Sequence, residues 1–158
     1  MVDEWNELGS TTLSVAGDTI TVSGFTEKKF NEYLTFAIDN GGGVGTTLTL
    51  DGVGGTSYAL RYNENGTEGT RLNDSAWVLR FNAADQLDIG YISNIAGEEK
   101  LMIGWHAAQN VAGAGTAPNR SRFAGKFVQT AQFTEITNAN DQGGDFDTDS
   151  NLTVFGTD

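Results

Sequence analysis

His106 is the only histidine in the chain, so any search for acid–base or metal chemistry begins with it. A single histidine cannot form a zinc site that needs several histidine ligands from the same chain. A Ser-His-Asp arrangement is formally possible because serine and aspartate are plentiful, but the Gly-x-Ser-x-Gly sequence of a nucleophile elbow is absent. Such a triad is defined by geometry, which a sequence does not provide. The place of His106, after an apolar stretch and before Ala107-Ala108, favours an ordinary histidine at a strand end or an interface.

A pair of carboxylates on a β-sandwich is the arrangement that glycoside hydrolysis would require. Nearly all the acids of this chain lie in turns, and only Asp88 and Glu135 lie clearly inside predicted strands. Asp88 alternates with Leu87 and Ile89, so a period of two places it on the solvent face. We therefore predict no catalytic residues and a non-enzymatic protein. A hydrolase on the same fold would need acids clustered around His106.

The acidic segment 145–150 resembles the first half of an EF-hand calcium loop. It departs from that loop at the sixth position, where Ser150 replaces the turn glycine, and at the twelfth, where Gly156 replaces the bidentate glutamate. A calcium site of another kind stays open beside the simpler interpretation of a solvated acidic loop. The carboxylates of that site would be those of Asp145, Asp147 and Asp149. The sequence predicts no other cofactor.

The chain has three tryptophans, which would suit a platform for a sugar ring if they were exposed. Trp77 and Trp105 alternate in phase with apolar neighbours, which instead predicts that both pack in the core. Trp5 lies outside any obvious strand pair, with Leu8 on the same side of its segment. We expect Trp5 to cap one end of the fold or to anchor the N-terminal segment on a neighbouring subunit.

The composition narrows the classes of partner. The net charge of −12 argues against nucleic acid, whose phosphates the protein would repel, and against anionic membrane surfaces. There is no cysteine, and no apolar run approaches the ~20 residues of a membrane-spanning helix. The N-terminus is acidic from its third residue and lacks the basic region of a secretory signal. Glycine is abundant at 21 residues and proline occurs once, as in a β protein with many tight loops.

The centre of the predicted sheet is a hairpin from Leu87 to His106, with its turn at 96–99. Leu87, Ile89 and Tyr91 alternate in the first arm, and an equivalent apolar set ending in Trp105 alternates in the second. Alternation of period two places each set on one face, which we assign to the core. The turn signals recur about every ten residues and predict nine to ten strands. The predicted fold is an all-β antiparallel sandwich of jelly-roll type, with an N-terminal arm or edge strand (1–17) and one domain (18–158).

The other predicted strands flank this hairpin. We expect a strand over 30–39 rather than a helix, and one long strand over 123–138 with a bulge near Thr134 and Glu135. The remaining strands are expected at 12–15, 19–23, 46–50, 57–63, 76–82 and 151–155. The stretch between Ala107 and Arg122 is the longest segment without a clear pattern, and such segments are usually functional or mobile. We therefore predict contacts with a partner from six residues, namely Trp5, Leu8, His106, Asn110, Pro118 and Arg120.

Several stretches of the chain resemble small jelly-roll virion proteins of tailed phages and environmental viruses. They are Trp5 to Val22, Lys28-Lys29-Phe30, Tyr58 to Gly66, Gly125-Lys126-Phe127, Thr130 to Ile136, Gly144-Asp145-Phe146 and Leu152 to Gly156. These matches are strand-and-turn patterns that cover most of the chain in outline. Members of that group are capsid decoration (cement) proteins, head fibres or receptor-binding modules, and they offer no catalytic residues to transfer.

The resemblance implies a capsid decoration protein on the exterior of the virion, made in the host cytoplasm. Its expected partners are the major capsid protein and further copies of itself in a homotrimer, joined by protein–protein contacts. The alternative is a tail or head-fibre module that binds a host glycan. Aromatic side chains exposed between Ala107 and Arg122 would favour that alternative, and the sequence has none there.

Overall fold

The computed structural model describes residues 4–79, 85–109 and 112–158, and this part of the chain forms an antiparallel β-sandwich with no helix. Twelve strands make two packed sheets, a few more than the nine to ten expected. The prediction of an all-β sandwich is therefore confirmed. No helix in the described ranges is long and apolar enough to cross a membrane.

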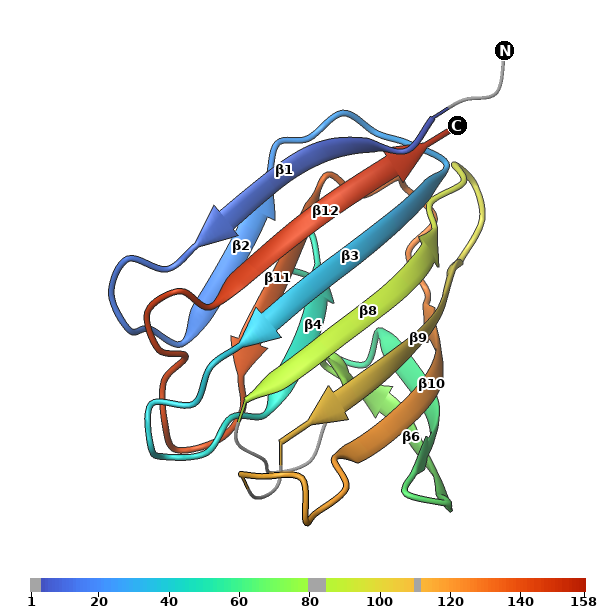
Figure 1. Cartoon of the computed structure of the whole chain (residues 1–158). Coiled ribbons are helices and arrows are strands. Elements are labelled where there is room, and N and C mark those ends of the chain that lie inside the picture. Colours follow the sequence, from blue (N-terminus) through green and yellow to red (C-terminus); the bar gives the residue numbers. More distant parts are fainter. Residues whose placement is uncertain (1–3, 80–84, 110–111) are drawn as a thin grey trace.

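The larger sheet has eight strands in the spatial order β1-β12-β3-β8-β9-β10-β5-β6 (Figure 1). Their bounds are β1 (Asn6–Thr12), β12 (Asn151–Thr157), β3 (Phe30–Ala37), β8 (Gln86–Ser93), β9 (Lys100–Ala108), β10 (Asn119–Phe127), β5 (Tyr58–Glu64) and β6 (Thr67–Asp74). The smaller sheet has four strands in the order β2-β11-β4-β7. Their bounds are β2 (Thr19–Ser23), β11 (Glu135–Asn140), β4 (Thr46–Leu50) and β7 (Trp77–Val78).

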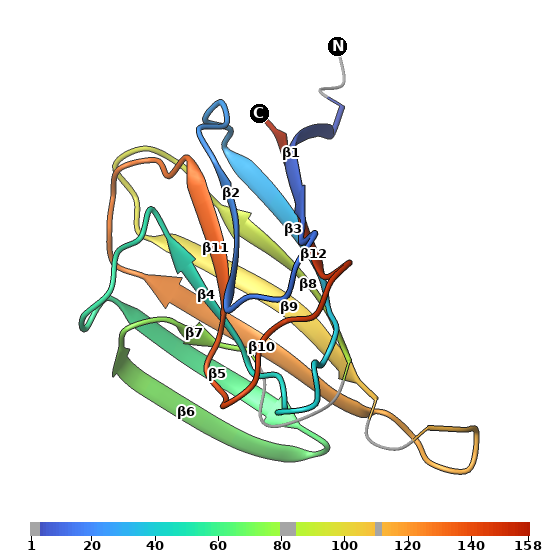
Figure 2. The same ribbon diagram turned by 90° about the vertical axis from the view of Figure 1, so that its left-hand side faces the viewer.

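Most connections pass from one sheet to the other, and the first and last strands pair with each other at the edge of the larger sheet. Figure 2 shows the two layers from the side, with β5 and β6 bending beneath β7. The larger sheet thus wraps around the smaller one, so its outer face bulges toward the solvent. We call the side of each sheet that faces the other sheet its inner face, and the opposite side its outer face.

The core lies between the inner faces and is dominated by aromatic rings. Tyr58, Trp77 and Phe127 pack together, with the Tyr58 and Phe127 ring centroids 4.7 Å apart. Trp77 lies in the core as predicted, and its indole N–H donates to the backbone oxygens of Ala59 and Lys126 at 3.2 Å. The buried indole therefore has polar partners, which removes the cost of hiding its N–H from water.

A row of direct partners across β3, β8, β9 and β10 explains the glycines of the central hairpin. The row reads Tyr33, Gly90, Gly104, Phe123 on the inner face. A Cβ on Gly90 would overlap the Tyr33 ring, and a Cβ on Gly104 would overlap the Phe123 ring. The two rings thus lie over the two glycines from either side. Large side chains cannot replace these glycines because the space above them is already filled.

The hairpin forms as predicted, but its two faces are the reverse of the prediction. Asp88 and His106 point inward and are buried, whereas Trp105 lies on the outer face with 51% of its surface exposed. Asp88 was expected in solvent and Trp105 in the core, and both expectations are wrong. The physical reason lies in the row just described, because rings from β3 and β10 fill the inner face and leave the hairpin's own large side chains outside.

Other strand predictions need smaller corrections. The stretch 123–138 is not one bulged strand, because β10 ends at Phe127 and β11 begins at Glu135 in the other sheet. The turn around Asn65 and Gly66 leads into β6, a strand that the sequence did not predict. The expected strand over 76–82 is seen as the two residues of β7, and its later part lies outside the described residues. The strand over 30–39 is confirmed as β3.

Candidate functional site

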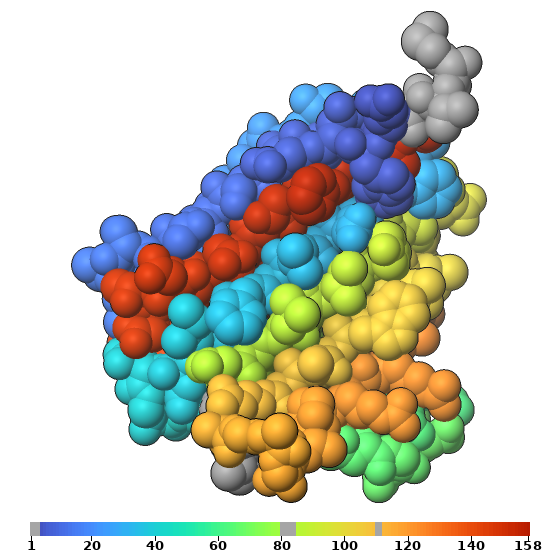
Figure 3. All heavy atoms as spheres, in the orientation of Figure 1, coloured from blue at the N-terminus to red at the C-terminus, as the bar shows by residue number. Residues whose placement is uncertain are grey.

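The outer face of the larger sheet is turned toward the viewer in Figure 3. It carries a concentrated set of exposed apolar side chains. Nine of the thirteen large apolar side chains that are exposed in the described ranges lie on β3, β8 and β9 or just before β1. We call these nine residues the exposed apolar face, and they are Trp5, Phe30, Leu34, Phe36, Leu87, Tyr91, Leu101, Ile103 and Trp105. The largest apolar patch of a soluble protein is often functional, so this face is the first candidate for a binding surface.

Among the described residues, the outer face of the smaller sheet does not expose large apolar side chains in this way. There the outward positions carry threonines, including Thr21, Thr49 and Thr137, which are direct neighbours across three strands. The Thr21 and Thr137 hydroxyl groups are hydrogen-bonded at 2.9 Å. One sheet therefore presents a hydroxyl surface to water while the other presents an apolar one.

Aromatic rings link the N-terminal segment to the centre of the exposed apolar face. Trp5 meets Tyr91 edge to face with ring centroids 6.1 Å apart, and Tyr91 meets Trp105 in the same way at 6.4 Å. A hollow of about 270 Å³ lies beside Trp5 and Tyr91, with Leu101 and Ile103 on its other side. Edge-to-face packing fixes these rings in place, so the face is preorganised rather than a set of loose side chains.

The exposed apolar face is bordered on one side by a basic strip. Four of the nine lysine and arginine residues of the chain project outward from the neighbouring strands β10 and β5. These four residues, which we call the basic strip, are Arg61, Arg120, Arg122 and Lys126. Arg122 is the direct neighbour of Trp105, and Lys126 of Leu101. Lys126 also pairs with Glu99 at 3.1 Å. In a protein of net charge −12 this is a local reversal of sign.

Behind the same strands, Asp88, His106 and Ser121 form a row of direct partners on β8, β9 and β10. His106 Nδ1 lies 2.8 Å from Asp88 Oδ1. The Ser121 Oγ is buried without a hydrogen-bond partner among the described residues, as is Asp88 Oδ2. These are the residue types of a catalytic triad, but all three face the core and at most 5% of each residue is exposed. In this structure a substrate in solvent does not reach the serine oxygen.

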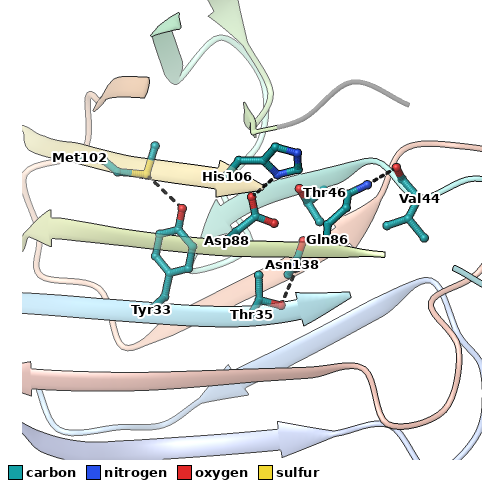
Figure 4. A network of polar contacts seen from close by, with 9 residues as sticks. All are labelled: Tyr33, Thr35, Val44, Thr46, Gln86, Asp88, Met102, His106 and Asn138. Atoms are coloured by element: carbon teal, nitrogen blue, oxygen red, sulfur yellow. Dashed lines mark hydrogen bonds and ion pairs between the residues drawn. The ribbon is translucent and has the colours of Figure 1, made fainter. Parts of the chain in front are cut away.

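This row belongs to a larger set of polar contacts inside the sandwich (Figure 4). Asn138 of β11 donates to the Thr35 hydroxyl of β3 at 3.1 Å, and Thr46 of β4 donates to Gln86 of β8 at 3.2 Å. Both bonds join one sheet to the other. Burial raises the pKa of the nearby Tyr33 phenol well above its usual value, and the charge of Asp88 adds to that effect. The sandwich thus has a polar layer that fixes how the two sheets sit against each other.

The aspartates considered for calcium are not gathered around a common point. Asp147 Oδ1 accepts a hydrogen bond from the Thr148 backbone at 2.7 Å, and Asp149 has a left-handed backbone conformation with φ of 69°. A hydrogen bond with Asp18 raises the pKa of Asp145, and the charge of Asp18 acts in the same direction. Within residues 4–79, 85–109 and 112–158, no group of three or more metal-ligating side chains is placed to share an ion.

The six predicted contact residues have different positions. Trp5, Pro118 and Arg120 are exposed, and Pro118 lines a hollow of about 380 Å³ together with Phe36 and Leu87. Leu8 packs against the core at a bulge of β1. Asn110 lies outside the described residues. His106 was expected at a strand end or an interface. The structure instead buries it within β9.

Sequence reasoning missed the centre of the exposed apolar face, namely Tyr91, Leu101, Ile103 and Trp105. It assigned them to the core because they alternate, and alternation alone does not tell which face is inside. The sequence did hold a signal for the inner face, in the positions between these apolar residues. Each strand of the hairpin has a glycine there, Gly90 and Gly104, and glycine in a strand often marks a place where another side chain covers the backbone. Neither a protein-family model nor a curated protein sequence matches the chain.

Proposed function

We propose that the chain is a non-enzymatic structural protein of the virion surface, a capsid decoration protein that binds the major capsid protein. The main observation behind the proposal is the exposed apolar face, which is suited to contact with another protein. The strand-and-turn resemblance to jelly-roll virion proteins suggests that this other protein is the capsid protein. Assembly as a homotrimer and a position on the capsid exterior are parts of the same proposal.

The size of the exposed apolar face suits the centre of a protein–protein interface. The three adjacent strands β3, β8 and β9 are eight, eight and nine residues long. At ~3.3 Å per residue and a strand spacing of ~4.8 Å they cover on the order of 400 Å². A standard interface covers ~800 Å² on each partner, with an apolar centre and a polar rim. The apolar face would form the centre, and the basic strip together with the edge strands would form the rim.

The shape of the sheet and the burial of the polar row support the same proposal. The larger sheet bends around the smaller one, so its outer face is convex as a whole and fits a broad partner surface (Figure 2). The hydrolase alternative requires access to Ser121 or His106, and both are buried. The polar row therefore supports a structural role for the sandwich interior.

Binding to capsids that lack this protein tests the proposal. Ile103→Asp places a carboxylate at the middle of the exposed apolar face, and we expect it to weaken capsid binding at least about thirtyfold, as for an interface hot spot of ~2 kcal/mol. Ile103 is 54% exposed, so the change leaves the core intact. Co-sedimentation of the purified protein with capsids gives the affinity.

Thr49→Asp is the matched control, because Thr49 projects outward from β4 in the smaller sheet. This variant is expected to bind capsids as the unmodified protein does. Equal capsid binding by the Ile103 variant would contradict the assignment of the face. If the unmodified protein fails to bind capsids but is retained on a host glycan array, the decoration function is wrong.

The alternative function is a receptor-binding module that recognises a host glycan. The ring series Trp5, Tyr91 and Trp105 favours it, because exposed aromatic rings offer flat apolar surfaces for sugar rings. Two features favour a capsid protein over a glycan as the partner. The sheet is curved outward, and several residues of the exposed apolar face are aliphatic rather than aromatic. The capsid and glycan experiments above distinguish the two functions.

A further inference from the structure

A groove of about 390 Å³ lies on the outer face of the larger sheet, between the exposed apolar face and the edge hairpin β5–β6. Its floor is Ala124, an outward residue of β10 with only a methyl group. Ile103 and Arg61 flank Ala124 in one cross-strand row, while Trp105, Arg122 and Asn63 form the next row. The volume lies within the ~300–1,000 Å³ of small-ligand sites.

The walls of this groove combine a flat ring with two cations. Trp105 is 51% exposed and stands on one side of Arg122. Arg61 and Arg122 occupy diagonal positions on adjacent strands, which is within reach of long side chains. Neither guanidinium group forms an ion pair with the described residues, in contrast to Lys126 and Arg71. Two unpaired guanidinium groups in an acidic protein form a local site for an anion.

We propose that this groove binds a saccharide that carries a carboxylate, of the uronate or sialate type. The apolar C–H face of the sugar ring would lie against Trp105. The carboxylate would be held by Arg61 and Arg122, because guanidinium–carboxylate hydrogen bonds are the strong, directional kind. Asn63 lies two strands from Trp105, a distance of about 10 Å at the ~4.8 Å strand spacing, and would bond sugar hydroxyl groups.

A glutamate at the edge of the groove limits how many negative charges the ligand can carry. Glu68 of β6 pairs with Asn63 and lines the groove at the far side from Trp105. Its carboxylate can accept hydrogen bonds from hydroxyl groups and would repel a second negative charge. The ligand is therefore a saccharide with a single carboxylate, held by Arg61 and Arg122, rather than a uniformly acidic chain. The groove shares Ile103 and Trp105 with the exposed apolar face, so a capsid and a saccharide would compete for this surface, and the saccharide is tested on the free protein.

Calorimetric titration of the purified protein with a trisaccharide that carries a single terminal glucuronate and with sialyllactose tests this site. We expect at least one of them to bind, and its affinity to fall at least about tenfold in both Arg122→Gln and Ala124→Tyr, a change of about 1.4 kcal/mol. Ala124 is exposed, so tyrosine fills the groove without entering the core.

Two control variants test whether a loss of affinity is specific to the groove. One removes a positive charge elsewhere on the sheet, and the other adds a bulky ring elsewhere on it. Lys126→Gln removes a charge of the basic strip that does not line the groove, and Ala107→Tyr adds a ring on β9 outside it. Both are expected to keep the affinity within about twofold, well below the 1.4 kcal/mol of a tenfold change.

Four results would overturn the inference. They are no binding of either acidic sugar, equal binding of a neutral galactose trisaccharide, an equal loss in Lys126→Gln, and equally tight binding of polyglutamate that depends on Arg122. The last result would assign the groove to an acidic protein segment instead. None of these results depends on whether the protein binds capsids.

Discussion

Replacing His106 with phenylalanine is expected to lower the free energy of unfolding by ~3–5 kcal/mol, because the change leaves a buried charge without its partner. The Asp88 side chain is fully buried, and its Oδ1 lies 2.8 Å from His106 Nδ1. The other oxygen, Asp88 Oδ2, already lacks a hydrogen-bond partner among the described residues. Removing the imidazole would thus strip the carboxylate of its one observed partner.

Urea denaturation followed by circular dichroism measures this loss. The double variant Asp88→Leu with His106→Phe provides the control, because it removes both polar groups and keeps the volume apolar. Replacing a buried pair by apolar residues is often close to neutral, so we expect the double variant to recover most of the stability. A loss below ~1 kcal/mol in the single variant would show that Asp88 is compensated in another way.

Replacing Lys100 with methionine is expected to cost ~3 kcal/mol, because three backbone carbonyl groups would lose their donor. Lys100 is fully buried at the start of β9, and its Nζ donates to the backbone oxygens of Ile95, Glu98 and Thr130 at 2.6, 2.7 and 3.1 Å. The ammonium group thus joins the turn of the central hairpin to the segment between β10 and β11.

Lys126→Met is the matched control for Lys100→Met. Lys126 is half-exposed and makes a single surface pair with Glu99, which is worth at most ~1 kcal/mol. In thermal and urea unfolding, Lys100→Met should therefore lose clearly more stability than Lys126→Met. Similar stabilities would contradict the assignment of Lys100 as the group that holds the hairpin turn.

The fold was predictable because its signals are local. Alternation in 19–23 and 46–50 placed Ile20, Val22 and Leu48 inward correctly, since threonine marks the solvent side of both strands. The turn chemistry around Asp51 and Gly52 was also visible, and both residues have positive φ in the structure. These features follow from side-chain polarity and backbone freedom within a few residues.

The faces of the central hairpin were not predictable from its own sequence. Both faces of β8 and β9 carry large apolar groups, with Ile92 and Met102 inside and Tyr91 and Ile103 outside. The choice is made by Tyr33 and Phe123, whose rings occupy the inner face above Gly90 and Gly104. Tyr33 comes from β3, which is far away in the sequence, and Phe123 comes from β10, the strand after the hairpin. The register of both strands against the hairpin is a tertiary property.

The loop that was predicted after the central hairpin is shorter in the structure. The stretch from Ala107 to Arg122 was expected to form one long loop, but β9 runs to Ala108 and β10 begins at Asn119. Arg120 becomes part of the basic strip because it lies in a strand rather than in a loop. The candidate surface is the outside of the hairpin itself.

Hydroxyl-radical footprinting with mass spectrometry, on the protein free and bound to capsids, locates the partner surface directly. Tyr91, Leu101 and Ile103 are exposed in the free protein and should lose most of their reactivity on the capsid. Val15 is 71% exposed and lies in the connection between β1 and β2, outside the exposed apolar face, so it should stay reactive. Protection of Val15, with Leu101 and Ile103 still reactive, would contradict a capsid contact through the exposed apolar face.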